Sequence, residues 1–216
     1  MKINTKNLLP TAFILLSCFL CLATNAQSKE TTIKKVYGQI GIGAASKNGA
    51  IADLGIQAIF KKNWTATVSY QSIEMDPKNL PADYEQGYTV IFIVPIYDEY
   101  PAVKMNLVSF TAGKYFETGR KTWFTTEAGI SIGTGDKMSF TPQPVIHDIW
   151  YATSNYSVTK ENTTTLGAVL KADFNWAFLP YVGLGAGVFA NFNSVQSPVG
   201  FQVKLLLGWM NTKRKH

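Results

Sequence analysis

Apolar and polar residues alternate along most of the chain after residue 35, with the two-residue period of β-strands that have one apolar face. The alternation is least regular at Leu107 and Val108, two adjacent apolar residues that break the period. This pattern predicts an all-β fold of eight antiparallel strands. The segments that carry it are 36–44, 51–60, 64–73, 105–116, 122–133, 165–177, 181–191 and 198–209.

The connections between these predicted strands differ in length in a regular way. Short connections at 61–63, 117–121 and 178–180 alternate with connections on the opposite side at 45–50, 74–104, 134–164 and 192–197. Residues 87–96 are apolar enough for a further strand, but Pro95 and the even number of the other strands predict a hairpin inside the long loop. Short turns at one rim and longer loops at the other predict an eight-stranded antiparallel up-and-down β-barrel.

The alternation alone does not tell whether the apolar face points into the barrel or out of it. The polar face consists mostly of Gly, Ser, Thr, Asn and Gln, which suits a crowded interior better than a surface in water. Four aromatic residues fall at the predicted short-turn rim, where an aromatic girdle meets a membrane interface: Trp64, Trp176, Tyr181 and Trp209. We therefore predict a transmembrane β-barrel, with a soluble lipocalin-like periplasmic binding barrel as the alternative.

The N-terminus has the features of a signal peptide. Lys2 and Lys6 precede an apolar stretch, and small residues end at Ala26, which predicts a signal peptide over 1–26. Cleavage before Cys18, as in a lipoprotein, is the alternative, although apolar residues continue after that position. Cys18 and Cys21 are the two cysteines of the chain and both leave with a signal peptide of this length, so the mature protein is predicted to have no disulfide and no Cys-ligated metal.

Together, the signal peptide, the eight alternating strands, the short turns and the final strand GFQVKLLLGW resemble the small eight-stranded outer-membrane β-barrels of Gram-negative bacteria, which include the membrane domain of OmpA. Ala26-Gln27 is similar to the cleavage region of secreted proteins from Bacteroidetes. One departure follows Trp209, because such barrels often end on an aromatic residue and this chain continues with basic residues.

The resemblance implies a location in the bacterial outer membrane after signal-peptide cleavage, with outer-membrane lipid and the barrel insertion machinery as partners. The predicted organisation is then a signal peptide at 1–26, a short periplasmic segment at 27–35, an outer-membrane β-barrel at 36–209 and a basic periplasmic tail at 210–216.

Four charged residues fall on the polar face of the predicted strands near mid-depth: Glu127, Lys171, Asp173 and Lys204. At about 3.3 Å per residue they stand at similar heights in the barrel. Isolated charges are costly away from bulk water, so they are expected to pair. The predicted interior ion network has both carboxylates sharing the two lysines, with Glu127 facing Lys171 on the neighbouring strand.

Charge and composition limit the possible partners. The chain has a net charge of +6, but its basic residues are scattered over turns without interleaved aromatics, so nucleic-acid binding is not predicted. Loop 74–104 is acidic instead, with Glu74, Asp76, Asp83, Glu85, Asp98 and Glu99 against Lys78 and Lys104. Loops 74–104 and 134–164 are also rich in aromatic residues, which suit either ligand recognition or packing of the loops on each other.

Three functions remain open for a barrel of this kind. The leading hypothesis is a non-enzymatic outer-membrane protein with a structural, adhesive or surface-binding role, which binds an extracellular ligand through loops 74–104 and 134–164. The second is a narrow channel or small-ligand transfer barrel. The third is an outer-membrane lipid hydrolase, for which His147-Asp148 with Ser139 or Ser154 is the available combination. No cofactor and no metal are predicted, because one internal histidine offers too few ligands.

Overall fold

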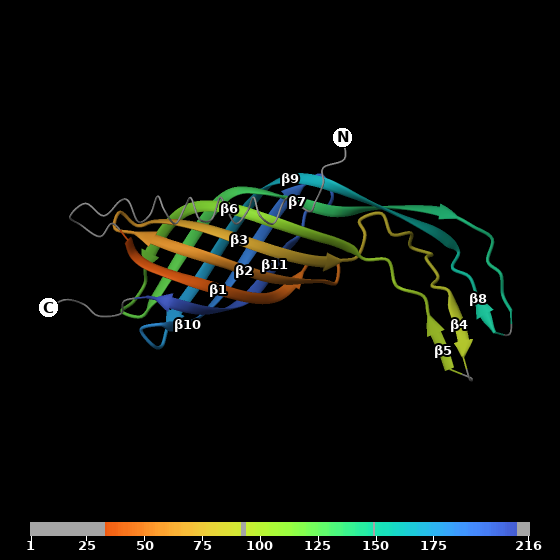
Figure 1. Cartoon of the computed structure of the whole chain (residues 1–216), viewed down its shortest axis with the longest axis horizontal. Coiled ribbons are helices and arrows are strands. Elements are labelled where there is room, and N and C mark those ends of the chain that lie inside the picture. Colours follow the sequence, from red (N-terminus) through yellow and green to blue (C-terminus); the bar gives the residue numbers. More distant parts are fainter. Residues whose placement is uncertain (1–32, 92–93, 149, 211–216) are drawn as a thin grey trace, which may run out of the picture.

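The computed structural model describes residues 33–91, 94–148 and 150–210, so the predicted signal peptide and most of the basic tail lie outside the described residues. Eight strands form a closed antiparallel barrel in the order β1-β11-β10-β9-β7-β6-β3-β2 (Figure 1). The barrel strands are β1 (Ile33–Ala45), β2 (Gly49–Phe60), β3 (Trp64–Met75), β6 (Val103–Glu117), β7 (Thr122–Pro142), β9 (Tyr156–Ala177), β10 (Val182–Asn193) and β11 (Val199–Trp209). This architecture confirms the predicted fold class. Within the described part of the chain, no helix is long and apolar enough to cross a membrane.

Two barrel strands are much longer than predicted. β7 and β9 remain paired from Thr122 opposite Trp176 to Pro142 opposite Tyr156, so they extend beyond the barrel as a two-stranded arm (Figure 1). The arm was missed because both of its strands are largely polar and carry no continuous apolar face.

A second, smaller sheet lies at the far end of this arm (Figure 1). It contains β4 (Tyr88–Ile91), β5 (Val94–Tyr97) and β8 (Tyr151–Ala152) in the order β5-β4-β8. The hairpin of β4 and β5 is the one predicted within 87–96. Its pairing with β8 joins the two long loops, and we call this sheet with residues 76–102 and 143–155 the loop platform.

The other two connections at this end of the barrel are short. Lys47 and Asn48, between β1 and β2, have φ angles of 57° and 53°, as both central residues of a type I′ hairpin turn do. Only the two connections that contribute to the loop platform are therefore long.

The apolar face of the barrel points outward. Leu184 and Val188 on β10 are 43% and 58% exposed, whereas Glu127 and Lys204 in the interior are 5% and 1% exposed. A soluble lipocalin-like barrel requires an apolar interior, which is the opposite of the arrangement at the middle of this barrel. Most outward positions of all eight strands follow the same rule, including Ile40, Ile56, Tyr70, Phe110, Ile130, Leu170, Leu184 and Val203.

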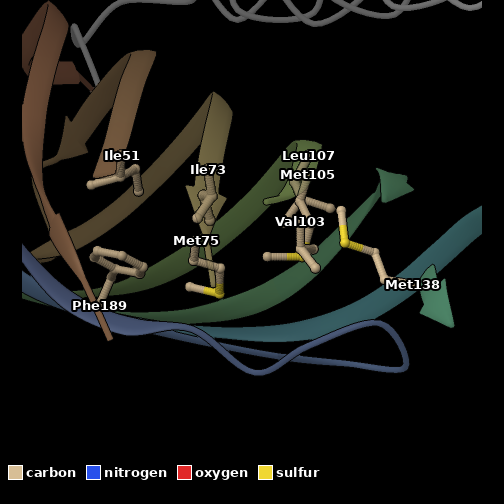
Figure 2. Packing of buried hydrophobic residues seen from close by; sticks show 8 residues of the cluster. All are labelled: Ile51, Ile73, Met75, Val103, Met105, Leu107, Met138 and Phe189. Atoms are coloured by element: carbon tan, nitrogen blue, oxygen red, sulfur yellow. The ribbon is translucent and has the colours of Figure 1, made fainter. Parts of the chain in front are cut away.

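The interior has three layers. A buried apolar cluster closes the short-turn end and contains Tyr37, Ile59, Tyr115, Trp123, Ala177, Leu206 and Met210. A second apolar cluster closes the end toward the loop platform and contains Ile51, Ile73, Met75, Val103, Met105, Leu107, Met138 and Phe189 (Figure 2). Leu107 points inward here, which explains the irregular alternation of its strand. Polar and charged side chains occupy the layer between the two clusters.

Two inward glycines permit the close approach of neighbouring strands. A Cβ atom on Gly113 would collide with the backbone oxygen of Thr126, and one on Gly129 would collide with that of Phe110. Both collisions involve backbone atoms of β6 and β7, which cannot move away as a flexible side chain can. Glycine at these positions therefore allows the sheet to curve tightly enough to close.

The seam between β1 and β11 provides a direct test of closure. Ile40 and Leu205 are opposite each other across it, and facing residues of antiparallel strands have Cα atoms about 5 Å apart, within disulfide range. We expect Ile40→Cys with Leu205→Cys, in a background of Cys18→Ser and Cys21→Ser, to form a disulfide on mild oxidation, detected by mass spectrometry.

Ile40→Cys with Phe201→Cys is the matched control, because Phe201 lies four residues further along β11, about 13 Å away. Equal cross-linking of both pairs would contradict the register of the seam.

Candidate functional site

Glu127 lies on β7 inside the barrel and receives hydrogen bonds from uncharged groups. Its Oε1 atom accepts from Gln57 Nε2 at 2.6 Å, Thr65 Oγ1 at 2.6 Å and Thr67 Oγ1 at 2.8 Å. Its Oε2 atom accepts from Thr111 Oγ1 at 2.6 Å. Inward hydroxyl and amide groups of β2, β3 and β6 thus hold this carboxylate without a lysine partner among the described residues.

The same network continues to the short-turn end of the barrel. The Tyr37 hydroxyl donates to Gln57 Oε1 and accepts from the Trp123 indole nitrogen at 3.2 Å. Lys35 lies beyond them, with its Nζ atom 3.6 Å from the centre of the Trp123 ring. Lys35 is the last residue of the predicted periplasmic segment 27–35, but β1 begins at Ile33 and buries this side chain.

Two buried ion pairs cross the rest of the polar layer. Lys171 Nζ lies 3.3 Å from Asp53 Oδ2 and donates to Ser69 Oγ at 2.8 Å. Lys204 Nζ lies 2.7 Å from Asp173 Oδ1. The structure therefore brings Asp173 and Lys204 together, but it does not pair Glu127 with Lys171 as expected.

The expected pairing was wrong for a geometric reason. Glu127 and Lys171 are opposite each other on β7 and β9, as inferred from their heights. The long lysine side chain instead crosses the lumen to Asp53 on β2. Asp53 occupies an inward position of its strand, so the alternation could have identified it as a fifth interior charge.

The buried charges balance. The buried lysines and carboxylates of the described residues are Lys35, Lys171 and Lys204 against Asp53, Glu127 and Asp173. Balanced charges in close ion pairs and hydrogen bonds of this kind suit a lumen that is filled rather than hydrated. Trp123 and Leu206 at one end, and Leu107 and Phe189 at the other, are at most 3% exposed, so described side chains fill the lumen at both ends.

The four predicted interface aromatics all lie on the outer surface near the short turns. Trp64 is the first residue of β3, Trp176 is next to the last residue of β9, and Trp209 ends β11. Tyr181 directly precedes β10, and all four side chains are exposed. Lys114 lies above Trp64, with its Nζ atom 3.8 Å from the ring centre.

Some aromatic residues of the long loops pack the loop platform together. The Tyr84 ring lies 6.0 Å from Tyr100, 6.0 Å from Phe140 and 6.4 Å from Tyr156. Burial, with the negative charge of Asp98, raises the pKa of the Tyr84 hydroxyl.

A second contact joins the two loops at Asp83. The Tyr156 hydroxyl donates to the Asp83 carboxylate at 3.0 Å, and this hydrogen bond raises the pKa of the Tyr156 hydroxyl. Asn155 Nδ2 donates to the Asp83 backbone oxygen at 2.5 Å. These contacts hold the arm and loop 76–102 in one arrangement.

Other aromatic residues of the loop platform remain exposed. Trp150 is 59% exposed and Tyr97 is 61% exposed. A cavity of about 530 Å³ opens beside Trp150, and its walls include Tyr88, Asp98, Gln143, Trp150, Tyr151 and Thr153. The two roles predicted for loop aromatics are thus divided between different residues, which sequence periodicity could not distinguish.

The residues proposed for hydrolysis are not assembled. His147 forms an isolated β-bridge with Ala152, and the Ser154 hydroxyl donates to the Tyr156 backbone oxygen at 2.7 Å. No hydrogen bond between His147 and Ser139 or Ser154 occurs in the described part of the chain. Nor does any group of three His, Cys, Asp or Glu side chains among the described residues form a metal site.

Comparison with known structures agrees with this architecture. The N-terminal β-barrel domain of Pseudomonas aeruginosa OprF superposes with a TM-score of 0.51 at 11% identity, covering 82% of this chain and 98% of that one. A de novo designed transmembrane β-barrel gives 0.47 at 10% identity, covering 83% and 99%. Ail from Yersinia pestis gives 0.46 at 12% identity, covering 82% and 97%. The OprF match shows that the chain has the fold of an outer-membrane eight-stranded barrel.

No protein-family model matches the sequence, and no curated protein matches it. The predicted similarity to small outer-membrane barrels therefore holds for the fold, whereas the Bacteroidetes origin stays a prediction.

Two double-mutant cycles that share Lys171→Met test the interior pairing. We expect a coupling free energy of about 2 kcal/mol with Asp53→Asn, because that carboxylate contacts the ammonium group. We expect less than about 1 kcal/mol with Glu127→Gln, whose partners are uncharged. Urea unfolding in lipid vesicles gives both values, and a larger coupling with Glu127 would contradict the observed network.

Proposed function

We propose that the protein spans the bacterial outer membrane after signal-peptide cleavage and assembly by the barrel insertion machinery. In this proposal it binds an extracellular ligand through the loop platform and catalyses no reaction. The observation that carries the proposal is that the apolar face of the barrel points outward and its polar face points inward, with a structured platform at one end. An apolar outer face and a charged, polar interior are stable only where the outside is not water.

The height of the apolar band supports a membrane span. Outward apolar positions on β9 run from Leu166 to Trp176, and those on β10 run from Val182 to Phe192. Each run rises about 33 Å along its strand, or about 25 Å at the tilt usual for such barrels, which is the height of the apolar band in outer-membrane barrels. The exposed aromatics near the short turns stand where the inner interface would lie.

The loop platform supports a binding role. Its two loops are joined by strand pairing and by the contacts of Tyr84 and Asp83, so little conformational entropy remains to be lost on binding. The exposed side chains at its far end include Val94, Ile96, Tyr97, Ile146, Trp150 and Tyr151. Exposed apolar and aromatic groups on an ordered support are typical of recognition surfaces.

A narrow channel is the second candidate, and the packing of the lumen disfavours it. Eight-stranded barrels leave an interior that side chains fill, and here apolar clusters close both ends. Single-channel steps from the native protein in a planar bilayer would favour the channel.

Substitution of Leu170 tests the membrane span. Leu170 is 51% exposed in the middle of the outer face, so Leu170→Lys should cost about 2–4 kcal/mol of unfolding free energy in lipid vesicles, measured by urea denaturation. Leu179→Lys is the matched control, because Leu179 is 52% exposed but lies in the turn between β9 and β10, and it should cost less than about 0.5 kcal/mol. Equal effects would argue against a lipid-facing band.

Shortening the arm tests the binding role. Replacing residues 139–159 with a four-residue turn removes β8 and the end of the arm, and it keeps Met138 and the segments of β7 and β9 that pair with β6 and β10. We expect this variant to keep the heat-dependent gel mobility of a closed barrel and to show no conductance steps. Cells that display it should lose adhesion to serum-coated glass relative to cells that display the native chain. Unchanged adhesion would contradict binding through the loop platform.

A further inference from the structure

The cavity of the loop platform contains a carboxylate, that of Asp98, which pairs with no cation among the described residues. The backbone of Asp98 is held in place, since its nitrogen donates to the Gly87 oxygen at 2.9 Å and its oxygen accepts from Gln86 Nε2. Its side-chain carboxylate makes no hydrogen bond or ion pair with any described residue. A positioned anionic group therefore faces the cavity with its acceptor capacity unused.

Two other polar side chains of the cavity wall already have hydrogen-bond partners. Gln143 Nε2 donates to the Ser154 backbone oxygen at 2.8 Å, and Thr153 Oγ1 accepts from the Ile146 backbone nitrogen at 3.0 Å. These contacts shape the wall and leave Asp98 as the charged group available to a ligand.

Aromatic residues contribute to the remaining walls. Tyr88, Trp150 and Tyr151 line the same cavity. The strand register places Tyr151 on the same face of the small sheet as Asp98, and it places Tyr88 on the other face, where its ring contacts Tyr97 at 6.0 Å. A carboxylate beside an aromatic ring is an arrangement that binds cations, because the ring face is electron-rich and the carboxylate supplies the counter-charge. Among cations, a guanidinium group fits best, since it is planar, stacks on rings and pairs with a carboxylate through two hydrogen bonds.

The charge around the cavity favours the same class of ligand. Loop 74–104 has six acidic residues and two basic ones. Lys104 of this loop lies within 4.0 Å of both Glu74 and Glu99, and Lys160 lies at 4.0 Å from Glu99. An anionic ligand would meet this field unfavourably, whereas a basic one would be attracted.

We propose that the cavity between β4, β8 and Asp98 binds an organic cation, specifically the guanidinium group of an arginine side chain on a partner protein. The inference rests on the proposed function, since it names the chemistry that the loop platform recognises. A volume of about 530 Å³ accommodates an arginine side chain with flanking peptide.

The test uses the full-length protein, isolated from membranes and held in lipid nanodiscs, and measures binding by saturation-transfer NMR titration. The probes are N-acetyl-arginine amide, its neutral isostere N-acetyl-citrulline amide, N-acetyl-glutamate amide and choline. We expect the arginine probe to bind at least tenfold more tightly than the citrulline probe, with weaker binding at higher salt. A preference for choline would assign the cavity to quaternary ammonium groups and overturn the arginine assignment.

Matched variants locate the interaction. Asp98→Asn should weaken arginine binding about tenfold, whereas Glu85→Gln, which removes one charge from the same loop outside the cavity, should change it less than twofold. Trp150→Ala should weaken binding, and Trp150→Phe should retain most of it. Heat-dependent gel mobility verifies that each variant is folded.

Equal binding of the arginine and citrulline probes, or an Asp98→Asn variant with unchanged affinity, would overturn the inference. If adhesion still depended on the arm in that case, the proposed binding function would stand and only its chemistry would be wrong.

Discussion

The constraint on which the rest of this structure depends is closure of the sheet between its first and last barrel strands. β1 and β11 pair over ten residues on each side, from Val36 opposite Trp209 to Ala45 opposite Gly200. In an environment without water, an unpaired sheet edge would leave a row of backbone groups unsatisfied, each at a cost of several kcal/mol. Closure satisfies these groups, and it also creates an interior too narrow to remain hydrated.

The composition of the interior follows from closure. Because the outer face is apolar, the alternating inward positions are polar, and they must satisfy one another inside the lumen. Glu127 is held by hydroxyl and amide donors, while Asp53 and Asp173 each have a lysine. Apolar clusters at both ends separate this network from bulk solvent. Loss of one partner would leave a buried charge without compensation, so the network favours one arrangement of the barrel.

The sequence contains enough information to predict the barrel because sidedness is a local property. A period of two residues identifies each strand, and the lengths of the connections give the topology. The interior pairing depends instead on where a long side chain ends. Lys171 reaches across the lumen to Asp53 rather than along the sheet to Glu127. The heights of residues along two neighbouring strands do not give the distance across the lumen. The loop platform is less predictable still, since it depends on Tyr151 and Ala152 pairing with a strand more than fifty residues earlier.

Two strands that together carry half of the interior charges also carry the loop platform. β7 contributes Glu127 and β9 contributes Lys171 and Asp173, and the same two strands continue without interruption to Pro142 and Tyr156. Tyr84 then packs against both strands of the arm through Phe140 and Tyr156. The position of the platform is thus determined by strand pairing that begins in the polar layer of the barrel. A filled, internally paired lumen consequently gives the arm a firm base, because the strands that form the arm are the same strands whose side chains are held in the lumen.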